Sequence, residues 1–216
     1  MPGATFAPHK RLWDISPTVD ASSPVFPGDT NYQQQWTARI GPGCPVNVSA
    51  ITLSPHVGAH ADAPLHYDPL GNAAGTLALT PFLRHCRVVH ALATGALVRP
   101  QHLRHALQDL PPRVLVRTCQ RFPVAHFDRQ LTASAPETVS LLADLGVHLI
   151  GIDSASIDPA DSKTLPCHQL IRQRGLRVLE NPLLDEVPEG DYELIALPLK
   201  LMSADASPVR AVLREL

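Results

Sequence analysis

The chain has 216 residues, of which 44% are hydrophobic, 18% charged and 5% aromatic, a composition typical of a folded globular protein rather than a disordered one. Its length is that of a single domain, which we expect to span residues 1–216. Eighteen Lys and Arg against twenty Asp and Glu give a net charge of −2, so the chain lacks the basic excess that binding to nucleic acid requires.

The N-terminal residues and the cysteines bear on where the protein resides. No apolar run approaches the roughly 20 residues needed to span a bilayer, so no membrane segment is predicted. Residues 1–14 are interrupted by Pro2, Pro8 and His9 and lack the continuous apolar stretch of a signal peptide. We therefore expect a cytoplasmic protein, without a membrane partner, whose cysteines are free thiols. None of them has CxxC spacing: Cys44, Cys86, Cys119 and Cys167.

Short β-branched and apolar runs predict strands along the whole chain, and helical patterns lie between some of them. The predicted strands are 12–15, 46–53, 86–91, 114–117, 148–152, 176–179, 192–197 and 209–213. Helices are predicted at 100–107, 136–145 and about 163–173. This mixture indicates an α/β domain with a mixed central sheet. The runs HLIGID and ELIALPL are apolar at successive positions, which predicts central strands covered on both faces.

The densest group of chemically active residues lies in the segment SPHVGAHADAPLHYD, residues 54–68. It places His56, His60, Asp62 and His66 within eleven residues. Imidazole and carboxylate groups are the ligands of zinc and neighbouring metals. The small Gly and Ala residues between them allow the backbone to fold closely around an ion. The segment therefore predicts a metal site, on a loop at the end of a strand because Gly58 and the flanking prolines oppose a helix.

Other histidines give weaker signals. Five of them stand alone and are read as surface or core residues: His9, His85, His90, His126 and His148. His102 and His105 have helical spacing but no acidic neighbour, and are read as surface residues.

Further ligands are needed because the first segment alone leaves a metal site incomplete. The segment CHQLIRQRGLRVLEN supplies His168 in the third predicted helix and Glu180 at the end of the strand that follows it. A short return from helix to strand would bring both residues to one edge of the sheet. Spacing alone does not pair them with His56.

The chain resembles the cyclase-like metal-dependent hydrolases and, within them, the bacterial kynurenine formamidases, also called arylformamidases. The HxxxHxDxxxH motif of residues 56–66 is typical of the broad family. Two further segments favour the formamidase branch, FPGDT at 26–30 and GIDSASIDP at 151–159, together with the C-terminal ADASPVRAVLREL. The resemblance covers essentially the whole chain and implies a compact domain of the swivelling β/β/α type that forms a homodimer.

The resemblance also implies a role for each matching residue. It implies two zinc ions per chain: the first is held by His56, His60 and Asp62, and the second by Asp62, His168 and Glu180. Asp62 and Glu180 would bridge the two ions. His66 matches the catalytic acid/base of the family. Phe26 takes the position of an aromatic residue, often Trp, that touches the substrate.

The implied reaction is hydrolysis of N-formyl-L-kynurenine to L-kynurenine and formate, a step of tryptophan degradation, by a hydroxide held between two zinc ions. His66 would move the proton of the attacking water to the leaving nitrogen. Two alternatives remain open at this point. A relative in the same superfamily could open a cyclic amide such as isatin, and a non-catalytic zinc-binding protein would keep the ligands without a use for His66.

Overall fold

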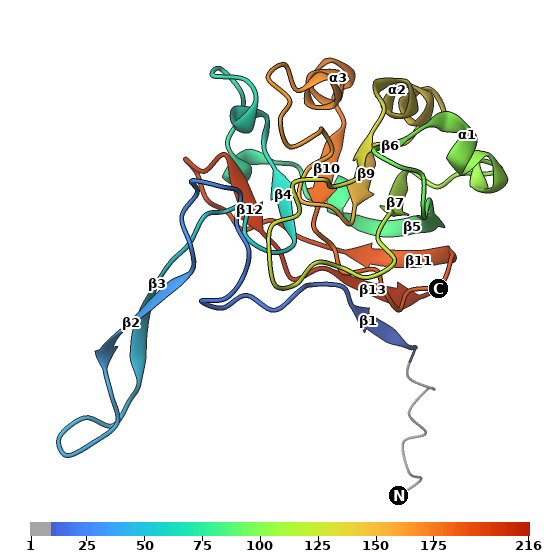
Figure 1. Cartoon of the computed structure of the whole chain (residues 1–216). Coiled ribbons are helices and arrows are strands. Elements are labelled where there is room, and N and C mark those ends of the chain that lie inside the picture. Colours follow the sequence, from blue (N-terminus) through green and yellow to red (C-terminus); the bar gives the residue numbers. More distant parts are fainter. Residues whose placement is uncertain (1–9) are drawn as a thin grey trace, which may run out of the picture.

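The computed structural model describes residues 10–216, so Pro2, Pro8 and His9 lie outside the described residues. Nine strands of this part form one mixed sheet in which strands from both ends of the chain lie side by side (Figure 1). Their order is β1 (Leu12–Asp14), β13 (Val212–Glu215), β11 (Gly190–Ile195), β5 (Leu83–His90), β7 (Arg113–Arg117), β9 (Leu149–Ile152), β10 (Arg177–Glu180), β4 (His60–Asp62) and β12 (Ala206–Pro208). The predicted α/β class with a mixed sheet is confirmed.

The centre of the sheet is parallel and its two sides are antiparallel. Strands β5, β7, β9 and β10 run parallel and are joined by crossovers that contain α1 (Pro100–Leu103), α2 (Pro136–Asp144) and α3 (Pro166–Arg174). The three helices lie on one face of the sheet, at the top of Figure 1. Each begins with a proline, whose missing N–H costs nothing in a first turn.

Two apolar clusters cover the two faces of the parallel strands. Val114, Ile150 and Val178 pack toward the cluster that includes Val139 of α2 and Ile171 of α3. Their neighbours in the same strands point into the second cluster, on the opposite face: Leu115, Leu149 and Leu179. All four residues of β9 are buried, so the prediction that the HLIGID run is a central strand covered on both faces is confirmed.

Strand β11 corrects the same prediction for the ELIALPL run. Tyr192 and Leu194 are buried, but Glu193 and Ile195, which alternate with them along the strand, are only half-buried. Strand β11 is paired on both sides with antiparallel neighbours, β5 and β13. Antiparallel strands commonly pack against the core on one face only. Strand β11 is therefore buried on one face, although the ELIALPL run is apolar at successive positions.

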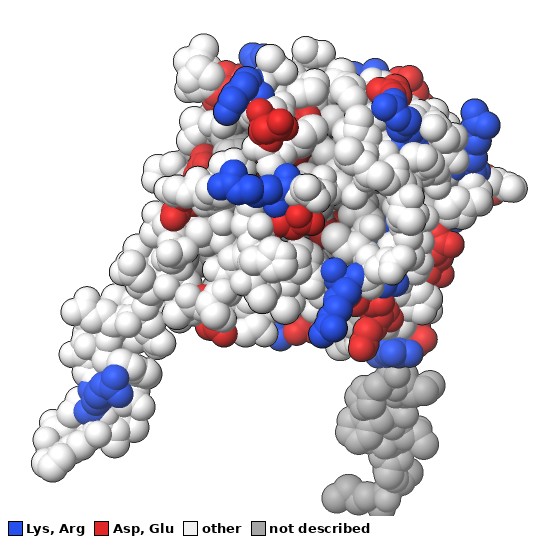
Figure 2. Space-filling model, in the orientation of Figure 1, with Lys and Arg blue, Asp and Glu red and all other residues white. Residues whose placement is uncertain are grey.

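The remaining elements are short, apart from a hairpin. Strands β2 (Gln33–Ala38) and β3 (Val48–Thr52) pair antiparallel and project far from the body of the molecule (Figures 1 and 2). We call residues 33–52 the arm. The pair β6 (Leu97–Val98) and β8 (Ala133–Ser134) is parallel. Single 3₁₀ turns complete the chain: η1 (Pro64–His66), η2 (Ala74–Thr76), η3 (Thr80–Phe82) and η4 (Arg104–Ala106).

The sequence did not predict five of the strands, β2, β4, β6, β8 and β12, and it placed the last strand too early in the chain. The loop predicted for residues 54–68 is wrong at its centre, because His60–Asp62 forms strand β4 between β10 and β12. The predicted strand at 209–213 begins only at Val212, and β12 ends before it at Pro208. Strands of three residues, such as β4 and β12, are too short to show the alternation of apolar and polar residues that predicts a strand. Among the described residues no helix is long and apolar enough to cross a membrane.

Candidate metal centre

Strand β4 carries the middle of the histidine-rich segment into the sheet. His60 and Asp62 are 1% exposed, and the alanines beside them belong to the apolar core. His56 precedes the strand on a turn that passes through Gly58, whose φ of +67° is a left-handed conformation that favours glycine. A Cβ on Gly58 would also lie 2.7 Å from a methyl carbon of Val19. The small residues between the ligand candidates therefore have specific places in the fold.

The second supply of ligands reaches the same place through a helix-to-strand return. His168 lies in the first turn of α3, and Gly175 ends that helix in a left-handed conformation. Strand β10 then runs antiparallel to β4 and places Glu180 opposite His60. As expected from the sequence, His168 and Glu180 meet at one edge of the sheet, with His168 Nε2 3.6 Å from Glu180 Oε1.

Asp62 and Glu180 each direct their two oxygens toward different histidines. Asp62 Oδ1 lies 3.2 Å from His56 Nδ1 and 3.5 Å from His60 Nε2, whereas Asp62 Oδ2 lies 3.2 Å from His168 Nε2. Glu180 Oε2 lies 3.3 Å from His60 Nε2, and its Oε1 is on the side of His168. Two carboxylates placed between two sets of imidazoles have the arrangement needed to bridge two cations.

Hydrogen bonds on the far side of the rings orient the imidazoles. His60 Nδ1 lies 2.9 Å from the carbonyl oxygen of Gly58 and donates to it, which leaves Nε2 free to bind a metal. His168 Nδ1 lies 2.7 Å from Asp158 Oδ2, and Asp158 also accepts backbone amides at the start of α3. Asp158 was not among the site residues predicted from the sequence. Its position in the GIDSASIDP segment, eight residues before the helix, was the only available signal.

The polar atoms of this cluster do not all satisfy one another by hydrogen bonds, and their arrangement suits a metal ion. His60 Nε2 and Asp62 Oδ1 are buried and have no hydrogen-bond partner. Within residues 10–216 no Lys or Arg forms an ion pair with Asp62 or Glu180. Buried charges in proteins are either paired or bound to metals. Neutral histidines carry no charge to pair with Asp62 and Glu180, so a metal cation would have to balance these two carboxylates. Two groups of side chains bring ligand atoms within 4.8 Å of one another: His56, Asp62 and His66, and His60, Asp62 and Glu180.

The electrostatics of the cluster favour positive charge. Burial alone would lower the pKa of His56, but the close contact with Asp62, the hydrogen bond to Asp205 and the charges of both carboxylates raise it to about 9. Burial likewise opposes the charged form of His168, yet Asp158 and Asp62 raise its pKa to about 10. Burial disfavours the charged form of Asp62 too, but the surrounding histidines hold its pKa well below the usual value. An environment that stabilises protons in this way also stabilises a metal cation.

His66 lies at the rim of the cluster, on the 3₁₀ turn that follows β4. Its ring centroid is 4.3 Å from that of His56 and 5.7 Å from that of His168. The side chain is 32% exposed, in contrast to the buried rings of His60 and His168. Its Nδ1 lies 3.3 Å from Asp205 Oδ2, a second residue that sequence reasoning missed.

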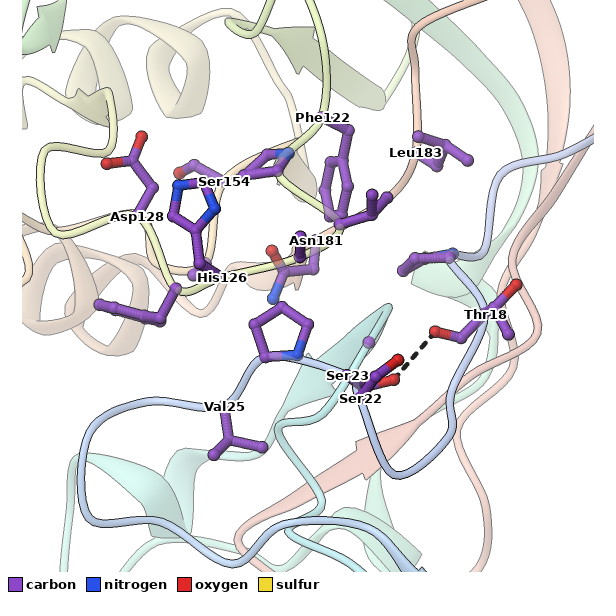
Figure 3. Close-up of a pocket in the computed structure, with 18 of the residues that line it drawn as sticks. Thr18, Ser22, Ser23, Val25, Phe122, His126, Asp128, Ser154, Asn181 and Leu183 are labelled. Atoms are coloured by element: carbon purple, nitrogen blue, oxygen red, sulfur yellow. Dashed lines mark hydrogen bonds between the residues drawn. The ribbon is translucent and has the colours of Figure 1, made fainter.

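A cavity of about 570 Å³ adjoins the cluster and is lined in part by His56. Figure 3 shows other residues of its lining, among them Phe122, Ser154 and Asn181. Its walls come from the segment before β2 on one side and from residues 119–131 on the other. Ser154 and Asn181, which follow β9 and β10, complete it. Phe26 lies in this wall with 47% of its surface exposed, and its ring is 5.1 Å from that of Phe127 in an edge-on arrangement. The cavity therefore offers aromatic surface beside the candidate metal ligands.

Comparison with known proteins identifies the family. Residues 13–159 match the family described as "Putative cyclase". A kynurenine formamidase of Delftia acidovorans is 70% identical over 207 residues, which cover 96% of this chain and 99% of that protein. This chain belongs to the kynurenine formamidase family.

Solved structures agree with the fold of this kynurenine formamidase family member. A potential metal-dependent hydrolase with cyclase activity superposes with a TM-score of 0.84 at 24% identity, covering 96% of this chain and 98% of the other. Isatin hydrolase A from Ralstonia solanacearum superposes with a TM-score of 0.79 at 23% identity, covering 96% and 92%. At these identities the likeness shows the shared fold alone.

Proposed function

We propose that this chain hydrolyses N-formyl-L-kynurenine to L-kynurenine and formate, with two zinc ions bound by each chain. Membership of the kynurenine formamidase family supports the reaction. The observation that carries the metal assignment is that Asp62 and Glu180 each face two different histidines with separate oxygens.

Each ion has a set of ligands in this proposal. His56, His60 and Asp62 would hold the first ion, and Asp62, His168 and Glu180 would hold the second, with Asp62 and Glu180 shared between the two sites. Zinc bound there would supply a water of lowered pKa and would polarise the carbonyl group to be attacked. The second ring nitrogens of His60 and His168 donate to Gly58 and Asp158, which sets the tautomer that a histidine ligand needs.

His66 moves the proton in the proposed reaction. The leaving group is an aryl amine, which departs poorly as an anion and must therefore receive a proton as the C–N bond breaks. His66 takes a proton from the attacking water and delivers it to that nitrogen. Its partial exposure, in contrast to the buried rings of His60 and His168, supports this assignment over a role as a further buried ligand.

The cavity is the proposed site for the aromatic part of the substrate. Phe26 stands in its wall next to Phe127, and His56 links the cavity to the metal centre. An aryl ring packed on Phe26 would fix the formyl carbon beside the metal-binding residues, and such positioning accounts for a large part of a rate enhancement.

The proposed assembly is a homodimer in which the arm contacts a second copy of the chain. A two-stranded ribbon is at best marginally stable by itself in water. The arm nevertheless exposes five large apolar side chains, and Arg39 is its only charged residue. Figure 2 shows it as an almost uncharged projection. The exposed apolar residues are Trp36, Ile40, Val46, Val48 and Ile51.

A panel of three substrates tests the function: N-formyl-L-kynurenine, isatin and a simple alkyl formamide, each given to zinc-loaded protein. A strong preference for the first is expected. A preference for isatin would favour an enzyme that opens cyclic amides. The only support for that alternative is the fold that this chain shares with isatin hydrolase A. Absence of hydrolysis of all three by protein with full metal would favour a zinc-binding protein without catalytic activity.

A further inference from the structure

Asp205 lies beside the metal centre although it is far from the histidines in sequence. It directly precedes β12, which pairs with β4 so that Ala206 lies opposite Asp62. The backbone carbonyl of Asp205 accepts the amide N–H of Ala63 at 2.9 Å. The position of Asp205 is therefore fixed by its backbone, independently of its own carboxylate.

One carboxylate oxygen of Asp205 faces two imidazole rings. Oδ2 lies 2.9 Å from His56 Nε2 and 3.3 Å from His66 Nδ1. In the described part of the chain, this carboxylate is the only group within hydrogen-bond distance of the His66 side chain. His56 meets Asp62 through its other nitrogen, Nδ1. Asp205 thus occupies Nε2 of His56 and Nδ1 of His66, so the nitrogens left to face the site are Nδ1 of His56 and Nε2 of His66.

We propose that Asp205 is the positioning residue of the acid/base His66, an inference that rests on the proposed function. Asp205 accepts the Nδ1–H of His66, so the neutral ring keeps Nε2 unprotonated and available to take a proton. The tautomer of a neutral imidazole is set by the hydrogen bond that its other nitrogen makes. In catalytic triads, a carboxylate with this role that is replaced by an amide leaves the wrong tautomer and lowers kcat by about 10⁴.

The second contact of Asp205 gives the same carboxylate a link to the metal centre. His56 Nε2–H donates to Asp205, and its Nδ1 then faces Asp62. The shared oxygen holds the His56 and His66 rings at a centroid distance of 4.3 Å. Asp205 in this way fixes the acid/base relative to a residue proposed to bind the first ion.

Asp205→Asn is the variant that tests the role, because the amide has the shape of the carboxylate and the backbone bond to Ala63 is kept. We expect kcat for N-formyl-L-kynurenine to fall by about 10² or more, within the range of general acid/base catalysis. KM should change little, since Asp205 does not line the cavity. Zinc content and the melting temperature should stay at their wild-type values. Asp14→Asn, which removes a surface carboxylate paired with Arg210, serves as the matched control.

A double variant shows whether Asp205 acts through His66. If it does, His66→Ala combined with Asp205→Asn should be no slower than His66→Ala alone. Losses that multiply in the double variant would overturn the proposal. A loss of zinc from Asp205→Asn in proportion to its loss of activity would overturn it too, because Asp205 would then serve mainly the ligand His56.

Histidine tautomers give a readout that does not depend on turnover. Two-bond ¹H–¹⁵N spectra of ¹⁵N-histidine-labelled, zinc-loaded protein should show His66 with its proton on Nδ1 in the wild type and on Nε2 in Asp205→Asn. Unchanged His66 signals would refute the assignment. Wild-type hydrolysis is measured separately, so if the proposed reaction fails, the tautomer of His66 still decides whether Asp205 sets it.

Discussion

Asp158 accepts a hydrogen bond from His168 Nδ1 at 2.7 Å, while His168 Nε2 lies 3.2 Å from Asp62 on the opposite side of the ring. Asp158 is fully buried, and it also binds the backbone amides of Cys167 and His168 at the start of α3. Burial raises the pKa of its carboxyl group, but these hydrogen bonds hold it below the usual value. The charged carboxylate therefore fixes the ring and increases its basicity as a ligand.

Asp158→Asn should weaken zinc binding at the second ion by about 10- to 100-fold, the range typical of a lost partner of a ligand. A competition assay with a chelating dye measures the affinity. Asp144→Asn, which removes an exposed carboxylate paired with Arg174 on the surface, should leave it unchanged. An unchanged affinity in Asp158→Asn would show that this carboxylate serves the helix terminus alone.

Metal content separates the shared ligand from the unshared ones. Asp62→Ala should remove both zinc ions, because Asp62 faces both sets of histidines. His168→Ala should mainly empty the second site, leaving close to one ion per chain by elemental analysis. Activity of the wild type should fall on acidification as protons compete with zinc for the histidines. A His168→Ala protein with full zinc and full activity would contradict the ligand assignment.

The local part of this site could be predicted from the sequence, whereas the long-range part could not. His56, His60, Asp62 and His66 are close in the chain, so their density alone indicated a metal site. The return from α3 to β10 was also readable, because a helical pattern, Gly175 and an apolar strand follow one another. These elements are defined by neighbours in sequence.

Asp158 and Asp205 lie in segments that support the family resemblance, but nothing in these segments indicates that either carboxylate lies beside the histidines. Asp205 reaches the site only through the pairing of β12 with β4, two three-residue strands separated by more than half of the chain. Strand β4 itself was predicted as loop because Gly58 and the flanking prolines oppose a helix, and its two polar residues, His60 and Asp62, gave no indication of a buried strand. Sequence pattern does not reveal pairings of this kind.

His66→Ala tests the separation of proton transfer from metal binding. We expect kcat to fall by about 10² to 10⁴, the usual contribution of general acid/base catalysis, while two zinc ions remain bound. Kinetics and elemental analysis on the same preparation measure both quantities. Because His66 lies within reach of His56 and Asp62, a parallel loss of metal and activity is the result that would make His66 a ligand instead.

Asp153 should give the stability of the fold a pH dependence of its own. Burial raises the pKa of its carboxyl group from 3.8 to about 6, although Thr118 and Cys119 donate hydrogen bonds that oppose the change. The folded state thus binds the proton more tightly than the unfolded chain. The contribution of Asp153 to stability is complete below pH 3.8 and is lost as the pH rises through about 6.

A comparison of wild type with Asp153→Asn isolates this contribution, because effects of pH on the metal site cancel between the two. The full difference in pKa corresponds to about 3 kcal/mol, of which about 2 kcal/mol falls between pH 4.5 and 7.5. As the pH rises over this interval, the free energy of unfolding of the wild type should therefore fall by this amount relative to that of the variant. Urea denaturation of the zinc-loaded proteins measures both free energies. A constant difference between the two proteins would mean that Asp153 keeps its charge throughout.

Phe26→Ala tests whether the aromatic wall of the cavity selects the substrate. Pairing of aromatic rings contributes about 0.5–1.5 kcal/mol, so kcat/KM for N-formyl-L-kynurenine should fall by about 2- to 10-fold. An alkyl formamide has no ring to lose contact with Phe26, and its turnover should be nearly unchanged. Leu12→Ala, which shortens an exposed apolar side chain on the edge strand β1, serves as the control. Equal losses for the aryl and the alkyl substrate would assign Phe26 to the packing against Phe127 rather than to recognition of the substrate.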